Sequence, residues 1–223
     1  MTHEMITSVI QASEISTESH LMLLNAVYFK GAWKEKFDEK WTESNHAKFQ
    51  IPMMATLGYF PIFEDDEVQV LAMPYEGDEN MSMYIILPRK HSGLEDVERS
   101  LNGSKMMHYF QNCKASKEFY VRMPKFALES ELDLVDVLES MGIIKAFAGI
   151  ADFTGMAFYW PLFIKQAKHK AVIEVNEEGE EAVVAAAAAV DEVRNSKFIA
   201  DHPFLFVIAK DGKDIFFIGR FAG

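Results

Sequence analysis

The sequence predicts an α+β protein that is rich in β-sheet and has only a few helices. Apolar strand-like runs are separated by Gly, Pro, Asn and Asp, and helical spacing of apolar residues is confined to short segments. Strands and helices do not alternate regularly, so large, mainly antiparallel or mixed sheets are expected. Phe is abundant, with 18 residues, and large aromatic side chains suit the faces of sheets.

Residues 1–87 predict one short helix and three strands. The helix is expected over residues 4–12. Residues 21–29 (LMLLNAVYF) are apolar apart from Asn25 and predict a central strand that is buried on both faces. Residues 68–73 and 81–87 predict two further strands, and the Pro, Gly, Asp and Asn between them favour an antiparallel connection.

The middle of the chain predicts three helices and a strand. Apolar residues at helical spacing indicate a helix over residues 94–101, with Gly103 as its stop, and a second short helix over 106–110. A strand follows at 119–123. The apolar face within residues 132–141 indicates the third helix, which ends at a glycine.

The C-terminal part predicts a strand at residues 171–175 and a hairpin. Residues 204–209 and 215–221 are two apolar strand-like runs that flank Asp211-Gly212. Asp-Gly between such runs is a strong hairpin signal, because both residues readily adopt the positive φ that a tight turn requires.

Composition excludes several classes of function. The formal net charge of −12 disfavours nucleic-acid binding, which needs clustered Lys and Arg. No apolar stretch is long enough to cross a bilayer, so no membrane partner is expected. The seven His residues show no metal-ligand spacing and the glycines no phosphate-binding motif, so neither a metal nor a cofactor is expected. The single Cys113 permits no intrachain disulfide, and its thiol is expected to be idle.

Residues 177–193 (EEGEEAVVAAAAAVDEV) are unusual for a globular protein. They lie between two predicted strands, where a short turn would be ordinary, and a connection of this length is usually functional or disordered. Small side chains permit two states, an exposed loop that is partly helical or an added β-strand. An ordinary Ala-rich linker or helix is the alternative.

Strand alternation divides this segment into two faces of small or apolar side chains. One face carries Glu180, Ala182, Val184, Ala186, Ala188 and Val190, and the other carries Glu181, Val183, Ala185, Ala187, Ala189 and Asp191. Gly179 supplies the backbone freedom for a bend where an added strand would begin.

Five segments, in order, resemble the serpins, the serine-protease-inhibitor family, and together they extend the resemblance over essentially residues 15–223. They are LMLLNAVYFKGAW (21–33), VLAMPYEGDENMSMYIILP (70–88), MPKF (123–126) with the later ADFTGM (151–156), HKAVIEVNEEG (169–179) and FIADHPFLFVI (198–208). The resemblance implies one serpin-like domain over 1–223 that lacks the family's N-terminal block of helices and strands. It also implies an exposed reactive-centre loop over 177–197.

The resemblance assigns roles to residues of this loop. The hinge comprises Glu177, Glu178, Gly179, Glu180, Glu181, Ala182, Val183, Val184, Ala185 and Ala186. The family's hinge spacing places the scissile bond at Val193–Arg194, which suits an elastase-like protease. A shift of one residue gives Arg194–Asn195 and a trypsin-like protease, whose pocket needs a cation.

The resemblance also assigns a sheet-opening region and a mechanism. Asn25 and His169 match a hydrogen-bonded, buried polar pair at the middle of the main sheet, and Trp33 matches a tryptophan where insertion begins. The chain is expected to be a suicide substrate without enzymatic activity of its own. Two features depart from the family pattern: Glu180 replaces a small hydroxyl residue, and Val183 and Val184 are bulkier than usual.

The partner implied is a serine protease, elastase-like or trypsin-like, with a cysteine protease as a variant. A monomer is expected, and loop–sheet polymers are a further outcome. A non-inhibitory binding or substrate protein and an inactive truncated fragment are the alternative functions. The sequence leaves the compartment open between extracellular and cytoplasmic.

Overall fold

The computed structural model describes residues 6, 8–15, 21–37, 51–78, 80–115, 118–156, 162–177 and 196–222. The chain divides into two compact units, the first formed by Met1–Lys30 and Ala127–Glu174 and the second by Gly31–Phe126 and Val175–Gly223. The single domain expected over 1–223 stays a prediction. Among the described residues, the helices are too short or too polar to span a bilayer.

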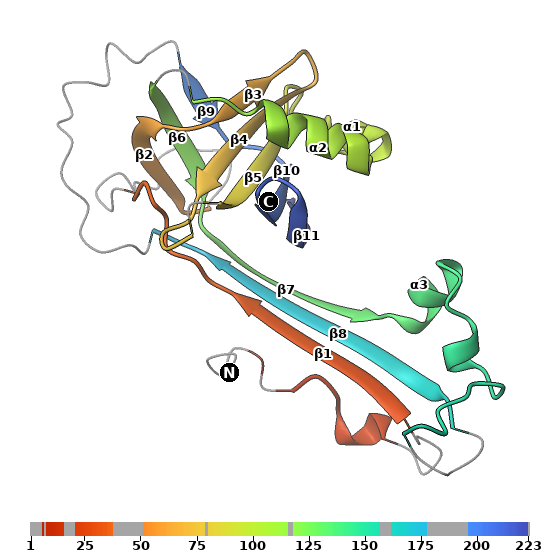
Figure 1. Ribbon diagram of the computed structural model, residues 1–223. Coiled ribbons are helices and arrows are strands. Elements are labelled where there is room, and N and C mark those ends of the chain that lie inside the picture. The colour runs from red at the N-terminus through yellow and green to blue at the C-terminus, as the bar shows by residue number, and fades with distance from the viewer. Residues whose placement is uncertain are drawn as a thin grey trace. The chain divides into compact units, whose positions relative to one another are not determined.

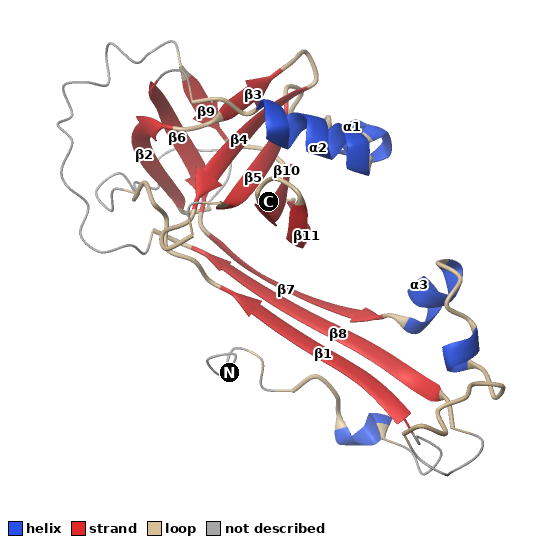
Figure 2. Cartoon of the chain, in the orientation of Figure 1, coloured by secondary structure: helices blue, strands red, loops and turns tan. Residues whose placement is uncertain are grey.

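The first unit is built on three long strands that lie side by side (Figure 2). Their order is β1 (Leu21–Phe29), β8 (Ile164–Val175) and β7 (Phe126–Asp133), with β8 in the centre. β1 and β8 are parallel, although their sequences lie far apart. The helical elements of this unit are short: η1 (Ala12–Glu14), α3 (Val135–Ser140) and η3 (Lys145–Phe147).

Two predictions for the first unit are wrong. The strand over residues 21–29 forms as predicted, but it is not buried on both faces, because Leu23 and Leu24 are 47% and 46% exposed. Successive side chains of a strand point to opposite faces of the sheet, so the exposure of both Leu23 and Leu24 shows that each face of β1 reaches solvent here. The helix over 4–12 is also wrong where it can be examined, since residues 8–11 are irregular and the only turn of helix described there is η1.

The second unit contains two sheets. The larger has the order β11 (Asp214–Phe221), β10 (Phe204–Lys210), β5 (Met81–Pro88), β4 (Val68–Pro74) and β3 (Ile62–Glu64), and every neighbouring pair is antiparallel. In the smaller sheet β6 (Glu118–Pro124) is antiparallel to β2 (Met53–Tyr59) and parallel to β9 (Lys197–Ile199). The predicted mixture of antiparallel and mixed sheets with few helices is confirmed.

The main hydrophobic core lies in the second unit, where α1 (Leu94–Ser100) and α2 (Gly103–Asn112) cover one face of the larger sheet (Figure 1). Buried side chains of β4, β5, β10 and both helices form this core. Gly103 does not stop α1 as predicted but begins α2. The reason is Asn102, whose Oδ1 accepts a hydrogen bond from the Lys105 backbone N–H at 2.9 Å and so caps the second helix.

Local turn chemistry accounts for the predicted hairpin. Asp211 and Gly212 have φ of 54° and 58°, and the Lys213 N–H donates to the Lys210 carbonyl at 2.9 Å. Positive φ at both central residues is typical of a type I′ turn, and the strand pairing on either side of the turn begins at Lys210 opposite Asp214. The third predicted helix is shorter than expected, because β7 continues through Leu132 to Asp133 and α3 begins only at Val135.

Candidate functional site

Two residues that precede the Ala-rich segment, Asn176 and Glu177, are fixed within the second unit. The Trp33 indole Nε1–H donates a hydrogen bond to the Asn176 carbonyl at 2.9 Å. The Glu177 carboxylate forms an ion pair with the Lys125 ammonium, and these side chains are only 14% and 25% exposed. The hydrogen bond from Trp33 to the backbone and the charge pair with Lys125 therefore both hold the chain that leaves β8.

Trp33 is held rigidly by its own neighbours. Its side chain is buried, stacks on the Tyr75 ring with centroids 4.7 Å apart, and meets the Phe37 ring edge-on at 6.0 Å. Backbone hydrogen bonds from Lys34 N to Pro74 O and from Glu76 N to Ala32 O fix the two chain segments that carry the stacked rings. These contacts hold the ring in the orientation that directs its indole N–H at the Asn176 carbonyl.

The segment that follows the Ala-rich residues is anchored on β6. The Tyr120 N–H donates to the Ser196 carbonyl at 3.1 Å, and β9 then runs parallel to β6 with Phe198 opposite Val121. Phe198 is fully buried, and the Ala200 N–H donates to the Arg122 carbonyl at 2.8 Å. Backbone pairing and one buried aromatic side chain therefore hold the returning chain.

The two anchors are close together compared with the chain that joins them. Lys125 and Tyr120 lie five residues apart along and just beyond β6, which corresponds to about 17 Å in a strand. Residues 178–195 connect the anchors, and a chain of that length reaches about 60 Å when extended. The connection is therefore much longer than closing the gap requires.

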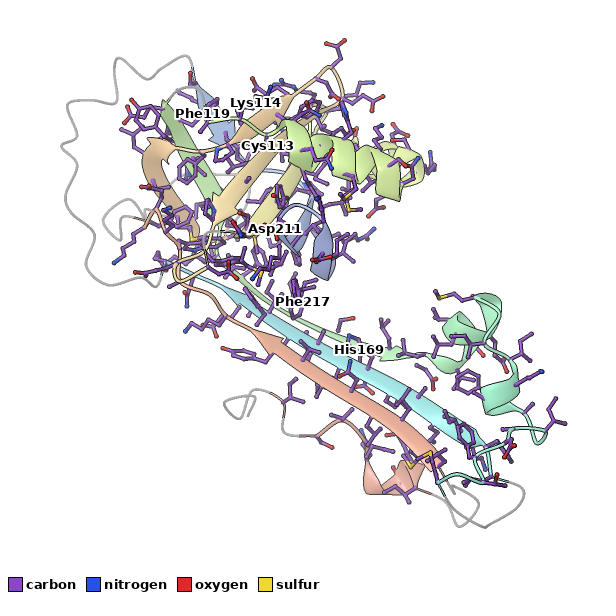
Figure 3. The ribbon with its side chains drawn as sticks, viewed as in Figure 1. Cys113, Lys114, Phe119, His169, Asp211 and Phe217 are labelled. Atoms are coloured by element: carbon purple, nitrogen blue, oxygen red, sulfur yellow. The ribbon has the colours of Figure 1, made fainter. Side chains whose placement is uncertain are left out.

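In the first unit, Asn25 and His169 are directly opposite one another in the parallel register of β1 and β8. The Asn25 Nδ2 donates to the His169 Nδ1 at 3.0 Å, so the His169 Nε2 carries the ring hydrogen. The pair exists as expected, but its predicted burial is wrong, because Asn25 is exposed and His169 is half-buried. Figure 3 shows His169 on the central strand of this sheet.

Glu174 adds a second link between the same two strands. The Tyr28 hydroxyl donates to its Oε2 at 3.2 Å, and the Lys30 ammonium lies 3.3 Å from its Oε1. Tyr28 and Lys30 are on or directly after β1, whereas Glu174 is near the end of β8. β1 and β8 are thus joined by polar side-chain contacts at their middle and at their ends.

Most of the predicted loop residues lie outside the described part of the chain. These are Glu178, Gly179, Glu180, Glu181, Ala182, Val183, Val184, Ala185, Ala186, Val193, Arg194 and Asn195. Of the predicted hinge the structure describes Glu177 alone. Lys125 and Tyr75, which position Glu177 and Trp33, were not predicted, because each meets its partner only through the tertiary fold.

Cys113 lies outside this site, at the end of α2. Burial raises the pKa of its thiol to about 12, and its Sγ donates to the Tyr109 carbonyl at 3.3 Å. A thiol rather than a thiolate at neutral pH is a poor nucleophile. This agrees with the expectation that the cysteine is idle.

The fold and the site together define a sheet protein in which an overlong connection joins β8 to β9 and both of its ends are anchored. The family model described as "Serpin (serine protease inhibitor)" matches residues 1–223. The chain belongs to the serpin family. Serpins are protease inhibitors and not enzymes, so the family assigns no catalytic residue here.

Several curated relatives are similar along nearly the whole chain. Intracellular coagulation inhibitor 2 of Tachypleus tridentatus is 39% identical, over 98% of this chain and 56% of its own length. Human Serpin B8 is 39% identical, over 97% of this chain and 61% of its own length, and chicken neuroserpin is 37% identical over 98% and 57%. The chain thus spans less than two thirds of the length of these relatives.

Solved structures give the same result for the fold. Uncleaved ovalbumin superposes with a TM-score of 0.83 at 31% identity, covering 96% of this chain and 60% of ovalbumin. A tumour-suppressing serpin superposes with a TM-score of 0.78 at 25% identity, covering 95% of this chain and 59% of that structure. The predicted serpin-like fold is confirmed for the part of the fold that the chain contains.

Proposed function

We propose that the chain acts as a suicide-substrate inhibitor of a serine protease, through cleavage of residues 177–197 and insertion of the cut segment into the sheet that contains β1 and β8. The protease nucleophile attacks a carbonyl carbon in the loop, the peptide bond breaks, and the new amine leaves. The loop residue that carried the carbonyl stays bound to the protease as an ester. Insertion then displaces and distorts the linked protease. Its active site can no longer activate the water molecule that would hydrolyse the ester.

The observation that carries this proposal is the parallel pairing of β1 and β8, together with the direct continuation of β8 into the loop. A chain that leaves β8 and turns back runs antiparallel to β8. Because β1 is parallel to β8, the returning strand is antiparallel to both. Insertion therefore exchanges one parallel ladder for two antiparallel ladders, which are somewhat more stable per residue.

Side-chain contacts join β8 to both of its neighbours, and on the β1 side the Lys30–Glu174 ion pair at 3.3 Å lies at the end of the strand rather than in its middle. On the other side, Lys170 pairs with Glu129 at 2.6 Å and Lys168 lies 3.7 Å from Asp133, so two ion pairs connect β8 to β7. The middle of the β1–β8 pair has the exposed Asn25–His169 hydrogen bond, and a bond of this kind contributes about 0.5–1.5 kcal/mol. This modest contact must break before a strand can enter.

The length and composition of the loop suit this step. Residues 180–191 match the length of β8, which spans Ile164–Val175. Both faces of such a strand are small or apolar except at the ends. Small side chains need little space between existing strands, and valine is a good strand former.

Glu180 supports a second candidate function, that of a serpin-like substrate or binding protein without inhibitory activity. It is the first side chain after Gly179, and its insertion buries a carboxylate at a cost of several kcal/mol if the charge stays unpaired. Slow insertion would let the protease hydrolyse the ester first. The result is a cut chain and an active protease.

Exposed apolar side chains of the first unit support a third candidate, an inactive fragment. They include Leu23, Leu24, Val137, Met141, Ile144 and Ile150, each close to half exposed or more. Large apolar side chains in such numbers are normally covered in a complete domain, and exposed apolar patches mark interaction surfaces or aggregation-prone ones.

Denaturing gels after incubation with an elastase-like and a trypsin-like protease test these candidates. A cooperative thermal transition of the full chain is established first, because an unfolded chain is cut without specificity. An inhibitor yields a covalent complex that survives denaturation, whereas a substrate yields only two fragments. N-terminal sequencing of the released C-terminal fragment begins with Arg194 if the bond is Val193–Arg194, and with Asn195 if it is Arg194–Asn195.

Two variants sharpen this test. Glu180→Thr removes the carboxylate that opposes insertion, so the ratio of complex to cut chain rises for an inhibitor. Arg194→Ala abolishes complex formation with a trypsin-like protease while complex formation with an elastase-like protease persists. If Arg194→Ala forms the complex with the trypsin-like protease as readily as the wild type does, the cleaved bond is not Arg194–Asn195. A cysteine protease in the same assay tests whether the target belongs to that class instead. The same sample on a sizing column reports whether the chain is a monomer or forms loop–sheet polymers.

A further inference from the structure

A cluster of two histidines and an aspartate lies at one end of the larger sheet of the second unit. His91 follows β5, and Asp201 and His202 connect β9 to β10. Their potential ligand atoms all lie within 4.8 Å of one another. No spacing of residues along the chain predicts this group, because His91 and His202 are far apart in sequence and the antiparallel pairing of β10 with β5 brings them to the same end of the sheet.

His202 is oriented as a metal-binding histidine would be. Its side chain is only 8% exposed, and its Nε2 lies 2.7 Å from the Pro88 carbonyl oxygen. A carbonyl can only accept, so Nε2 carries a hydrogen and donates it. Metal-ligating histidines usually donate their second ring N–H to a backbone carbonyl or a carboxylate in this way, which fixes the ring and leaves the other nitrogen for the ion.

The other ring nitrogen of His202 faces a second acceptor. Its Nδ1 lies 2.8 Å from the Asp201 Oδ1. With the hydrogen of a neutral ring on Nε2, two lone pairs face each other, and this arrangement is favourable only with a cation at that point. The His91 Nε2 lies 3.8 Å from the same Oδ1 and supplies a third possible ligand atom for a cation.

We propose that His91, Asp201 and His202 form a binding site for a divalent transition-metal ion, with Zn²⁺ as the best match. Imidazole nitrogen and carboxylate oxygen bind Zn²⁺ at about 2.0–2.2 Å, which places tetrahedral ligands about 3.4 Å apart. The Asp201 Oδ1 lies 2.8 Å and 3.8 Å from the two imidazole nitrogens, distances that bracket that spacing, and all three ligand atoms lie within 4.8 Å of one another. Water completes the tetrahedron.

Binding requires movement mainly of His91. The two imidazoles stack with ring centroids 4.4 Å apart and planes at 23°, whereas coordination needs both lone pairs to converge on the ion. The His91 side chain is 77% exposed and turns about its own bonds without disturbing the core. The ion joins the end of β5 to the connection after β9, and β9 is the strand that anchors the returning loop.

Isothermal titration of the full chain with ZnCl₂ tests the site, with MgCl₂ as the hard-cation comparison. One Zn²⁺ per chain is expected, with no heat from Mg²⁺. His91→Ala and Asp201→Asn each weaken Zn²⁺ binding by about tenfold or more. His108→Ala is the matched control, because His108 is an exposed histidine on α2 outside the cluster, and it leaves the affinity unchanged.

A thermal melt provides the second measurement. Zn²⁺ raises the melting temperature of the wild-type chain and of His108→Ala equally, and at the same concentration it raises that of His91→Ala less, because this variant binds the ion more weakly. Equal affinity of the wild type and His91→Ala overturns the site, as does a wild-type chain that binds no Zn²⁺.

Discussion

Asn25 on β1 and His169 on β8 face one another across a parallel strand pair, with the Asn25 Nδ2 3.0 Å from the His169 Nδ1. This hydrogen bond lies in the middle of the ladder that must open if a loop strand enters between β1 and β8. It is exposed and made by side chains only, so it can be removed without touching the backbone hydrogen bonds of either strand.

Asn25→Ala is expected to ease strand entry. Loss of one exposed hydrogen bond weakens the β1–β8 pair by about 0.5–1.5 kcal/mol, which raises the rate of peptide incorporation about 2- to 10-fold. The measurement is the rate at which a labelled peptide with the sequence of residues 180–191 is taken up. Asn112→Ala is the matched control, because Asn112 also contacts a histidine Nδ1, that of His108, but on α2. Equal rates in both variants would show that the Asn25–His169 pair does not limit opening.

Glu177→Lys is expected to destabilise the anchor at the start of the loop. The substitution places two ammonium groups together at a site where the native partners are largely buried. We expect a loss of about 1–3 kcal/mol in the free energy of unfolding. Denaturant titration of Glu177→Lys, Lys125→Glu and the double variant measures the coupling, and the double variant regains much of the loss. Strictly additive effects would mean that the two charges do not interact.

Gly219→Ala is expected to destabilise the hairpin end of the larger sheet. A Cβ at this position would lie 2.4 Å from the Phe206 Cζ on the paired strand, so the aromatic ring must move. Overpacking of this kind costs about 1–3 kcal/mol. Gly103→Ala is the control, since a Cβ there meets nothing within 4 Å and the residue lies in α2. Chemical denaturation should separate the two variants, and a neutral Gly219→Ala would contradict the packing described.

Cys113 is expected to resist alkylation in the folded chain. Burial raises the pKa of its thiol to about 12, so at pH 8 iodoacetamide reacts slowly until the chain unfolds. The folded state holds the proton more tightly than the unfolded state, so this contribution to stability is complete below about pH 9 and declines as the pH rises toward 12. The difference in unfolding free energy between wild type and Cys113→Ala, followed from pH 8 to 11, measures it. Rapid labelling of the native chain at pH 8 would contradict the assignment.

Local chemistry explains which parts of the fold were predictable. The hairpin at Asp211-Gly212 and the strand over residues 21–29 form as predicted, because turn residues and strand-forming runs act on their immediate neighbours. The end of α1 was misjudged because Asn102 caps the following helix and makes Gly103 its first residue. The burial of β1 was misjudged because an apolar run shows only that burying these side chains is favourable. It does not show that the described part of the chain packs other side chains against them.

The sequence by itself determined the family, the sheet-rich fold class and the unusual character of residues 177–193. Each of these follows from residue types and their order along the chain. Only the tertiary structure decided that Asn25 meets His169, that Lys125 pairs with Glu177 and that His91 lies beside His202. The physical reason is that such contacts depend on strand register and sheet order. These are set by the packing of residues distant in sequence, and no local pattern records them.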